Sequence, residues 1–266
     1  MSLAPERGWA MNTSVTGCIV THNNETKIRE TLDSVLSRTK GVALKLYAVD
    51  NLSTDGTVDI LRGKEKEYDN LEVIENRCNR GFGAGHNTVL KRLDSTYHLI
   101  INPDVILRQD AIADMAAYLD KNPDIGLLSP NVCFPDGSIQ ILGKRDPKIK
   151  YLAASRMRGE RPPGRLLREY AMLDRDMSQP FDIENATGCF MMLRTELFKR
   201  IGGFDERYFM YFEDCDLTRT VRKTSRAVYY PGAVVYHVWG RESKKNFKLM
   251  LIQIKSMFAY FRKWRI

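Results

Sequence analysis

The amino-acid sequence predicts an α/β protein in which a mostly parallel, Rossmann-like central sheet is flanked by helices. Three observations lead to this prediction. Short apolar runs alternate with stretches of helical spacing over the first 135 residues, and such alternation is typical of parallel sheets. The chain has 266 residues, which is enough for one large core. Its composition, 43% apolar and 28% charged, is that of a globular protein.

The first half of the chain contains four expected strands and four expected helices. The strands are short runs rich in Val, Ile, Leu and Tyr, at 15–20, 44–49, 71–74 and 97–101. The helices are expected at 25–38, 55–67, 83–93 and 109–120. Ser53, Thr54 and Asp55 are capping residues for the second helix, and Asn122-Pro123 ends the fourth.

The second half of the chain has a less regular pattern. Further strands are expected over 125–142, broken by the turn residues Pro135-Asp136-Gly137. A stretch rich in Pro and Arg at 143–180 is typical of a long functional loop. The remaining expected elements are a strand at 189–193, helices at 195–201 and 213–223, strands at 227–230 and 233–238, and a helix at 244–264.

We expect a domain over 14–240, preceded by a leader or disordered segment at 1–13 and followed by a basic C-terminal helix at 241–266. No apolar run approaches the roughly 18 residues that a membrane-spanning helix needs. The five cysteines form no C-x-x-C pair, which favours reduced thiols over a zinc knuckle or redox pair. These features indicate a cytoplasmic protein.

Positive charge is concentrated in two segments. The net charge is +8, but 143–170 and 241–266 together carry more than this, so the rest of the chain is mildly acidic. Such segments indicate an anionic surface or an anionic acceptor, and plain solvated charge is the alternative. In the C-terminal helix, one apolar stripe contains Phe247, Met250, Leu251, Ile254, Phe258 and Phe261. This stripe either packs on the domain or docks on the inner face of an anionic membrane.

Four polar strings follow the four expected strands of the first half. They are Thr21-His22-Asn23, Asp50-Asn51, Asn79-Arg80-Gly81 and Asn102-Pro103-Asp104. Because the carboxyl ends of parallel strands share one edge of the sheet, these strings predict a binding edge there. Thr21 and Asn23 can hydrogen-bond a ring, and Asp50 can accept from the N–H of a pyrimidine base or cap a turn.

The glycine-rich string from Asn79 to Asn87 is a turn into a helix, which allows a close approach of backbone to a ligand. It has neither the Lys-Ser/Thr of a P-loop nor the position of a dinucleotide fingerprint. Asp104 can provide oxygen for a hard cation on a diphosphate, or it can cap the next helix. The string Tyr208–Leu217 places three acids after an aromatic run, where one can act as a base or all can serve as caps.

With these strings in place, the chain resembles the family-2 glycosyltransferases, which have the GT-A fold. The resemblance runs from about Ser14 to His237. Its motifs in order are VTHN, AVDNLSTDGT, NRGFGAGHN, LIINPDV, ATGCFMMLR, IGGFDERYFMYFEDCDL and VYHVWG. The strings NPD, GGFDE and YFEDCDL look most like the bacterial rhamnosyltransferase-like branch, which uses dTDP-L-rhamnose.

The resemblance implies a role for residues at matching positions. Asp214 would be the catalytic base of an acidic pair, and Asp104 and His237 would hold a divalent cation, Mg²⁺ or Mn²⁺. Asn102 replaces the first acid of the family's D-x-D motif, and an amide is a poorer partner for such a cation. The nucleotide-sugar site would contain Thr21, Asn23, Asp50, Asn51, Asn79, Gly81, Asn87, Asn102, Asp104 and Gly188.

The implied organisation is a nucleotide-sugar-binding half at 14–135 and an acceptor and catalytic half at 136–240, which includes the basic loop 143–180. The implied reaction is an inverting transfer of L-rhamnose from dTDP-rhamnose, or of a hexose from a UDP-sugar. The acceptor would be a hydroxyl of a cell-surface polysaccharide or lipid-linked glycan.

Two other classes of function remain open at this point. A sugar nucleotidyltransferase would need a Gly-rich, basic loop after the first strand, which THNNET does not provide. A non-catalytic nucleotide-sugar binder would not need Asp214. No nucleic-acid-binding motif is present, so no nucleic-acid partner is expected.

Overall fold

The computed structural model describes residues 13–157, 162–238 and 246–266 of the chain. Its strands are β1 Ser14–Thr21, β2 Ala43–Asp50, β3 Leu71–Glu75, β4 Tyr97–Ile101, β5 Val105–Ile106, β6 Ile125–Cys133, β7 Phe181–Asp182, β8 Phe190–Arg194 and β9 Arg226–His237. Its helices are α1 Ile28–Arg38, α2 Thr57–Glu67, α3 Phe82–Asn87, η1 Leu90–Arg92, α4 Ala111–Lys121, α5 Ile149–Met157, α6 Arg165–Tyr170, α7 Thr195–Arg200, α8 Glu213–Val221 and α10 Phe247–Trp264. The segments expected at 1–13 and at the start of the C-terminal region lie largely outside these ranges.

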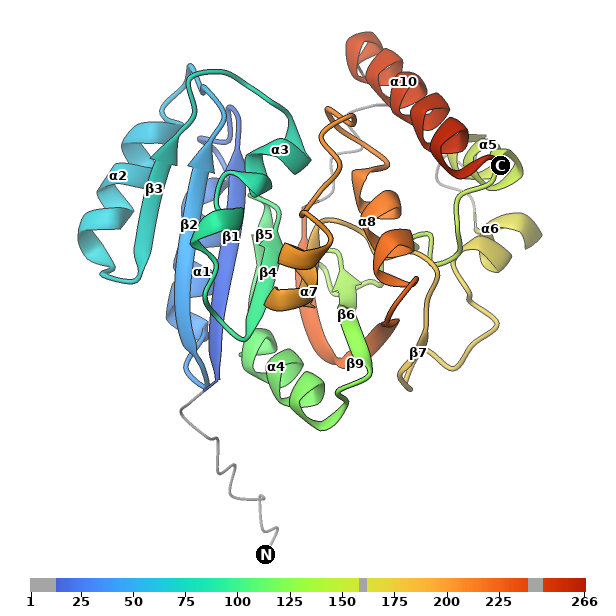
Figure 1. Ribbon diagram of the computed structural model, residues 1–266, viewed down its shortest axis with the longest axis horizontal. Coiled ribbons are helices and arrows are strands. Elements are labelled where there is room, and N and C mark those ends of the chain that lie inside the picture. Colours follow the sequence, from blue (N-terminus) through green and yellow to red (C-terminus); the bar gives the residue numbers. More distant parts are fainter. Residues whose placement is uncertain (1–12, 158–161, 239–245) are drawn as a thin grey trace, which may run out of the picture.

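One sheet runs through the described part of the chain in the order β3-β2-β1-β4-β8-β6-β9-β5, with β7 paired to β9 (Figure 1). The four strands β1 to β4 are mutually parallel, as the sequence predicts. The strand β8 lies antiparallel between β4 and β6. Strands from both halves of the chain therefore meet at the centre of the sheet.

Helices cover both faces of the sheet, because successive side chains of each strand point to opposite sides. On β1, Ile19 enters the core formed with α1, α2 and α4. Its neighbours Cys18 and Val20 enter the opposite core, formed with α7 and α8. The predicted fold class, an α/β protein with a central sheet flanked by helices, is confirmed.

The elements differ from the expected ones in their detail. The predicted helix at 83–93 divides into α3 and η1. The two strands expected on either side of Pro231-Gly232 are one strand, β9, whose pairing with β6 jumps from Tyr230 to Val234. Pro231 cannot donate to a ladder, so the break appears as a bulge and not as a chain reversal. The stretch 143–180 contains the short helices α5 and α6.

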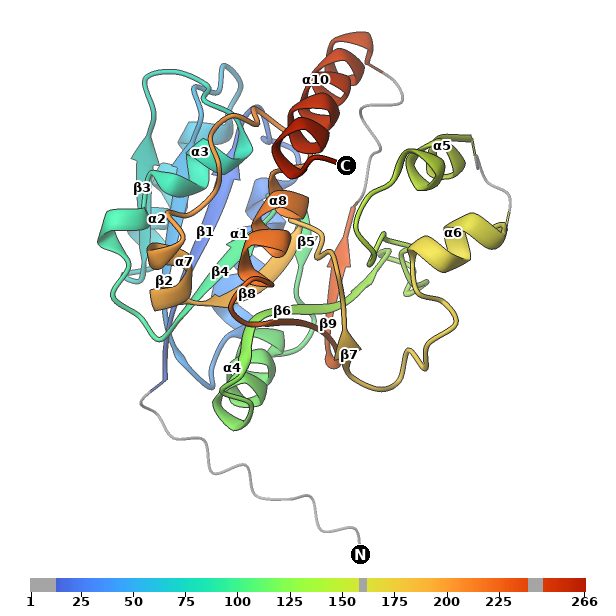
Figure 2. The same cartoon turned by 45° about the vertical axis from the view of Figure 1, so that its right-hand side comes forward.

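The C-terminal helix α10 packs against the domain, but mostly not through its apolar stripe. Ser256 and Tyr260 are buried in this contact. Of the predicted stripe, Phe261 packs beside Phe212, whereas most of the rest faces outward: Phe247 is 69% exposed and Phe258 is 65% exposed. Figure 2 shows α10 at the outer edge of the molecule, beyond α8. None of the helices that the structure describes is long and apolar enough to cross a bilayer.

Two fully buried histidines give the fold a specific acid sensitivity. Burial lowers the pKa of His98 to about 3, and it lowers the pKa of His86 well below its usual value. Below about pH 6.5 the unfolded chain binds protons on these groups and the folded chain does not. Their contribution to the free energy of unfolding is therefore complete above that pH. It is lost as the pH falls from there towards the folded pKa.

We expect the free energy of unfolding to fall by about 1.5 kcal/mol for His98 alone between pH 6.5 and pH 5. Urea unfolding followed by circular dichroism at several pH values measures this slope. His98→Phe keeps a ring stacked on Phe198. It should lower the slope of the free energy of unfolding against pH by the contribution of one bound proton. An unchanged slope in this variant would contradict the assignment.

Candidate active site

The loops after β1 and β2 form a single hydrogen-bonded unit. Thr21 donates its hydroxyl to Asp50 Oδ1 at 2.8 Å, and Ser53 donates its backbone N–H to Asp50 Oδ2 at 2.8 Å. Asp50 is 2% exposed, so its carboxylate closes the turn to Ser53. This is the turn role that the sequence left open. Contact of Asp50 with a nucleobase stays a prediction.

Asn51 and Gly81 join this unit to the third loop. Asn51 Nδ2 donates to the Gly81 carbonyl at 2.9 Å, and Asn76 donates to Asn51 Oδ1 at 2.8 Å. Asn23 is exposed and left-handed, with a φ of 58°, and its Oδ1 accepts from the Thr54 N–H at 2.8 Å. The predicted binding edge is therefore a continuous set of loops at the carboxyl ends of the parallel strands.

The glycine-rich string owes its composition to close packing within the protein. Gly81 has a φ of 88°, and a Cβ there would lie 2.0 Å from the carbonyl oxygen of Phe209. Asn79 Oδ1 accepts from the Gly81 N–H at 2.9 Å, which fixes the turn. A Cβ on Gly85 would lie 2.7 Å from Val20. Backbone approach to a ligand is therefore not needed to explain these glycines.

Asn87 connects the donor half to the loop that precedes α8. Its Nδ2 donates to the Phe204 carbonyl at 2.8 Å, and its Oδ1 accepts from the Phe204 N–H at 2.9 Å. Both ends of the amide are thus engaged by one residue of the opposite half. Asn87 holds the two halves together, and its predicted contact with the donor remains untested.

Asp104 lies between two cationic groups. Its Oδ1 is 3.2 Å from His237 Nε2, and its Oδ2 is 3.5 Å from Lys27 Nζ. The Asn102 amide nitrogen is 3.5 Å from the same His237 nitrogen. The structure thus brings together Asp104 and His237, which the resemblance assigns to a cation, with Asn102 beside them.

Gln140 fixes the orientation of His237 through two contacts. Gln140 Nε2 donates to the His237 carbonyl at 2.6 Å, and its Oε1 is 3.2 Å from His237 Nδ1. Burial would lower the pKa of His237, but the adjacent Cys189 and Asp104 together raise it to about 10. The imidazole therefore points a fixed Nε2 at Asp104. The composition of this group, a carboxylate, an imidazole and an amide, fits a cation that takes its other ligands from a diphosphate.

Asp214 is positioned at the first turn of α8. Its Oδ2 accepts from the Gly188 N–H at 3.0 Å, and its Oδ1 accepts from the Cys215 N–H at 2.8 Å. Burial raises the pKa of Asp214 despite these two bonds. A half-buried carboxylate with a raised pKa is better suited to accept a proton at neutral pH than an exposed one.

Glu213 differs from its neighbour Asp214. It is 6% exposed, and within the described part of the chain its Oε2 has no hydrogen-bond partner. Burial, with a contribution from the Asp214 charge, raises the pKa of Glu213 well above its usual value. Burial therefore disfavours a charge on Glu213, whereas the two N–H donors to Asp214 stabilise a charge there.

The turn before these acids is strained. Tyr211 and Phe212 have φ values of 71° and 68°, in the left-handed region that aromatic residues rarely adopt. Such a conformation costs on the order of 1–3 kcal/mol per residue and persists only where surrounding contacts impose it. The surrounding contacts therefore decide where α8 begins, and with it the position of Asp214.

Two consecutive residues link the acid pair to Asp104. Gly188 donates to Asp214, and the next residue, Cys189, accepts from the Asn102 N–H at 2.8 Å through its carbonyl. A Cβ on Gly188 would lie 3.2 Å from Asp214 Cβ and 3.5 Å from the Phe82 ring. Asp214 and the group formed by Asp104 and His237 are thus joined through two consecutive backbone residues.

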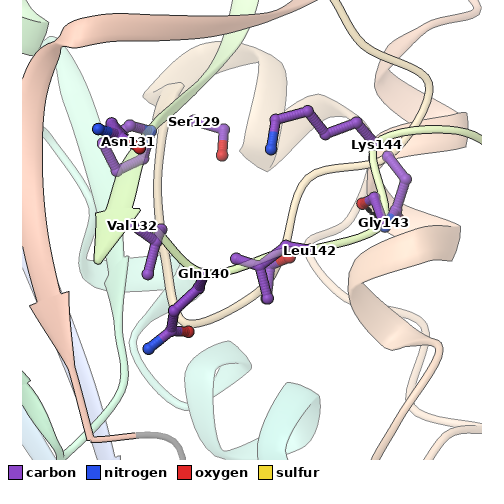
Figure 3. Close-up of a pocket in the computed structure, with 10 residues that line it drawn as sticks. Ser129, Asn131, Val132, Gln140, Leu142, Gly143 and Lys144 are labelled. Atoms are coloured by element: carbon purple, nitrogen blue, oxygen red, sulfur yellow. Dashed lines mark hydrogen bonds between the residues drawn. The ribbon is translucent and has the colours of Figure 1, made fainter. Parts of the chain in front are cut away.

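A small polar pocket adjoins this site on the side of the second half (Figure 3). Its lining includes Gln140, which bonds His237, and Thr187, which directly precedes Gly188. Figure 3 shows the Lys144 ammonium directed toward Ser129 across the pocket. Burial lowers the pKa of Lys144 to about 8. A cationic donor in such a place suits a hydroxyl or an anionic oxygen of a substrate.

Sequence reasoning missed several of these residues. Gln140 falls in the stretch 125–142, where strands were expected, and Lys144 falls in the basic loop 143–180. Glu213 was not separated from Asp214. Only their burial distinguishes these residues from ordinary surface residues. In irregular segments, no periodic pattern in the sequence indicates which side chains are buried. Arg241 follows the string VYHVWG and would be a further basic contact for a diphosphate, but it lies outside the described residues.

Comparisons with known proteins agree with this geometry. A model of the family "Glycosyl transferase family 2" matches residues 16–202. The chain belongs to this family. It is 27% identical over 206 residues to an N-acetylglucosaminyl-diphospho-decaprenol L-rhamnosyltransferase of Mycobacterium tuberculosis, covering 73% of this chain and 66% of that protein. It is 24% identical over 262 residues to the rhamnosyltransferase WbbL of Escherichia coli, covering 93% and 92% respectively.

The fold is also found among solved structures of glycosyltransferases. The mannosyltransferase PcManGT from Pyrobaculum calidifontis, in complex with GDP-Man and Mn²⁺, matches with a TM-score of 0.64 at 19% identity. The match covers 97% of this chain and 68% of that one. The glycosyl transferase family 2 chain is therefore GT-A-like in its fold. The chain spans 66% of the length of the mycobacterial relative.

Proposed function

We propose that this family-2 glycosyltransferase transfers a sugar from a nucleoside diphosphate to an acceptor hydroxyl, with inversion at the anomeric carbon. The observation that supports this most directly is the link through Gly188 and Cys189 between Asp214 and Asn102, which precedes Asp104 by two residues. It brings a proton-accepting carboxylate and a charge-binding group to one site. Family membership favours this reaction over nucleotidyl transfer or binding without catalysis.

In the proposed reaction, Asp214 accepts the proton of the acceptor hydroxyl as its oxygen attacks the anomeric carbon. The bond from that carbon to the diphosphate oxygen breaks, and the nucleoside diphosphate leaves with the electron pair. The Gly188 and Cys215 N–H groups orient the Asp214 carboxylate for this transfer. Burial raises the pKa of the neighbouring Glu213, which disfavours a competing charge there.

We propose that Asp104 and His237, with Asn102 beside them, hold Mg²⁺ or Mn²⁺; His237 would bind as the neutral imidazole, so the cation takes the place of the proton between Nε2 and Asp104. A bound divalent cation would neutralise charge on the leaving diphosphate. Asn102 contributes no charge, so Asp104 supplies the only carboxylate of the three residues. Affinity for the cation should therefore depend strongly on the phosphates of the donor.

For the donor we propose dTDP-L-rhamnose, with a UDP-hexose as the alternative. The support is the resemblance to two proteins named as rhamnosyltransferases. The acceptor would be a sugar hydroxyl of a lipid-linked glycan or surface polysaccharide, approaching from the side of Lys144. We place the reaction at the cytoplasmic face of the membrane.

Asp214→Asn should leave binding of dTDP-L-rhamnose unchanged and lower turnover by about 10²-fold or more, the usual scale for a positioned base. Release of dTDP with water as the acceptor measures turnover, and calorimetry measures binding. The matched comparison is Glu213→Gln, which resembles the protonated acid and should cost less than about 3-fold. Near-normal turnover in Asp214→Asn would remove it from the role of base.

Asp104→Asn should weaken Mn²⁺-dependent binding of dTDP by about 10-fold or more, because the site loses its carboxylate. Calorimetric titration with and without Mn²⁺ measures the effect. Asp124→Asn is the control, since Asp124 is an exposed carboxylate that pairs with Arg226. Equal Mn²⁺ dependence in the Asp104 variant and the wild type would exclude Asp104 as a ligand.

We further propose that the outer face of α10 contacts an anionic membrane surface. Four exposed apolar residues recur there at helical spacing: Phe247, Leu251, Ile254 and Phe258. The same spacing places Lys248, Lys255 and Arg262 along one side of this stripe. An apolar stripe with flanking basic residues is suited to lying in the interface of an anionic bilayer.

The double change Leu251→Ser and Phe258→Ser should lower binding to phosphatidylglycerol vesicles by about 100-fold, since each side chain contributes about 1.5 kcal/mol when buried. Cosedimentation measures the bound fraction. Ile139→Ser, at a residue 49% exposed on another surface, should bind like the wild type. Equal pelleting of the double variant would refute the membrane contact.

A further inference from the structure

The inner face of α10 is attached to the segment that carries the acid pair. Lys263 Nζ lies 2.7 Å from Asp216 Oδ2 and 2.8 Å from Asp205 Oδ2. Trp264 Nε1 donates to Asp216 Oδ1 at 2.8 Å. The side chain of Asp216 is only 3% exposed. Removing one partner of such an ion pair leaves a buried charge without compensation, which is strongly unfavourable.

Asp216 and Asp214 are two residues apart in the first turn of α8, so their side chains point in nearly opposite directions. Asp214 bonds Gly188 at the active site, while Asp216 bonds α10 and also accepts from the Tyr208 hydroxyl at 3.2 Å. The first turn of α8 is thus held from two sides. A displacement on the α10 side moves the Asp214 carboxylate with it.

The strained turn before α8 is held by the same helix. Ser256 donates to the Met210 carbonyl at 2.8 Å, and the ring of Tyr260 lies 5.6 Å from that of Phe212. On its other side, the segment is fixed by the Phe82 N–H, which donates to the Phe209 carbonyl at 2.9 Å. The left-handed residues before α8 lie beside these two attachments. Strain of this kind persists only where surrounding contacts impose it, and α10 supplies some of those contacts.

We propose that Lys263 and Trp264 are positioning residues for the transfer reaction: through Asp216 they fix the start of α8 so that Asp214 meets the acceptor hydroxyl. This inference rests on the proposed role of Asp214. Neither residue touches the donor site, so their loss should lower the rate of the chemical step and leave donor binding intact. Misplacement of a reacting group by about 1 Å can cost as much as 10²-fold in rate.

The test compares Lys263→Met with Lys263→Arg in dTDP release from dTDP-L-rhamnose. We expect Lys263→Met to lower kcat about 10-fold while the donor KM stays within about twofold. Lys263→Arg keeps a cation that can bridge Asp205 and Asp216, and it should retain at least half of kcat. Trp264→Phe removes the N–H donor but keeps an aromatic ring, and it should give a smaller loss of kcat in the same direction.

The matched control is Lys64→Met. Lys64 also bridges two carboxylates, Asp33 and Glu67, each at 2.7 Å, but it does so between α1 and α2. Lys64→Met should lower the free energy of unfolding without lowering kcat. A kcat within twofold of the wild type in Lys263→Met, or an equal fall of kcat in Lys64→Met, would overturn the proposal.

A second readout does not depend on activity. The amides of Gly188 and Cys215 donate to Asp214, so their hydrogen exchange reports whether that carboxylate is in place. Exchange at both should speed up in Lys263→Met and stay as in the wild type in Lys64→Met. If the wild type releases no dTDP, the proposed function fails, and the exchange data still decide whether α10 holds the acid. Unchanged exchange in Lys263→Met would refute the attachment.

Discussion

The backbone at Gly188 and Cys189 is the constraint on which the arrangement of the site depends. These residues enter β8, the antiparallel strand that lies between β4 and β6. One N–H here bonds Asp214, and one carbonyl bonds the backbone of Asn102. A side chain at residue 188 would crowd Asp214 and Phe82. The position of β8 in the sheet therefore brings two acidic motifs, more than 100 residues apart in the chain, to the same place.

Much of the fold and of the donor half could be predicted because it follows from local pattern. Four apolar runs with a polar string after each imply four parallel strands with their carboxyl ends at one edge, and β1 to β4 have this arrangement. The order of β8 and β6 could not be derived in this way. Antiparallel insertion of a distant strand depends on contacts between remote segments, which leave no periodic trace. The resemblance, and not the spacing, connected Asp214 and His237 with Asp104.

The roles of individual residues were harder to predict than the location of the site. Asp50, Asn87 and Gly81 lie where expected, yet their polar groups and conformations are engaged by the protein itself. A short polar residue at a strand end looks the same in sequence whether it holds a ligand or a neighbouring loop. The two cases differ in how many polar groups remain free to bond a ligand. That number depends on how the loops fold.

The C-terminal helix is a second case in which the sequence pattern does not show which residues make the contacts. Most of its apolar stripe, its most obvious pattern, lies on the outer face. The face that packs is built largely from Ser256, Tyr260, Lys263 and Trp264, with Phe261 at its edge. Polar groups can serve in that contact because each finds a charged or carbonyl partner, so the usual cost of burying them is offset. One helix thus presents an apolar surface outward and holds the acid-bearing turn inward. If α10 binds a surface through its outer face, as we propose, the binding would also order the start of α8. The two would be coupled through the bonds of Lys263 and Trp264 to Asp216 and the contacts of Ser256 and Tyr260 with the preceding turn.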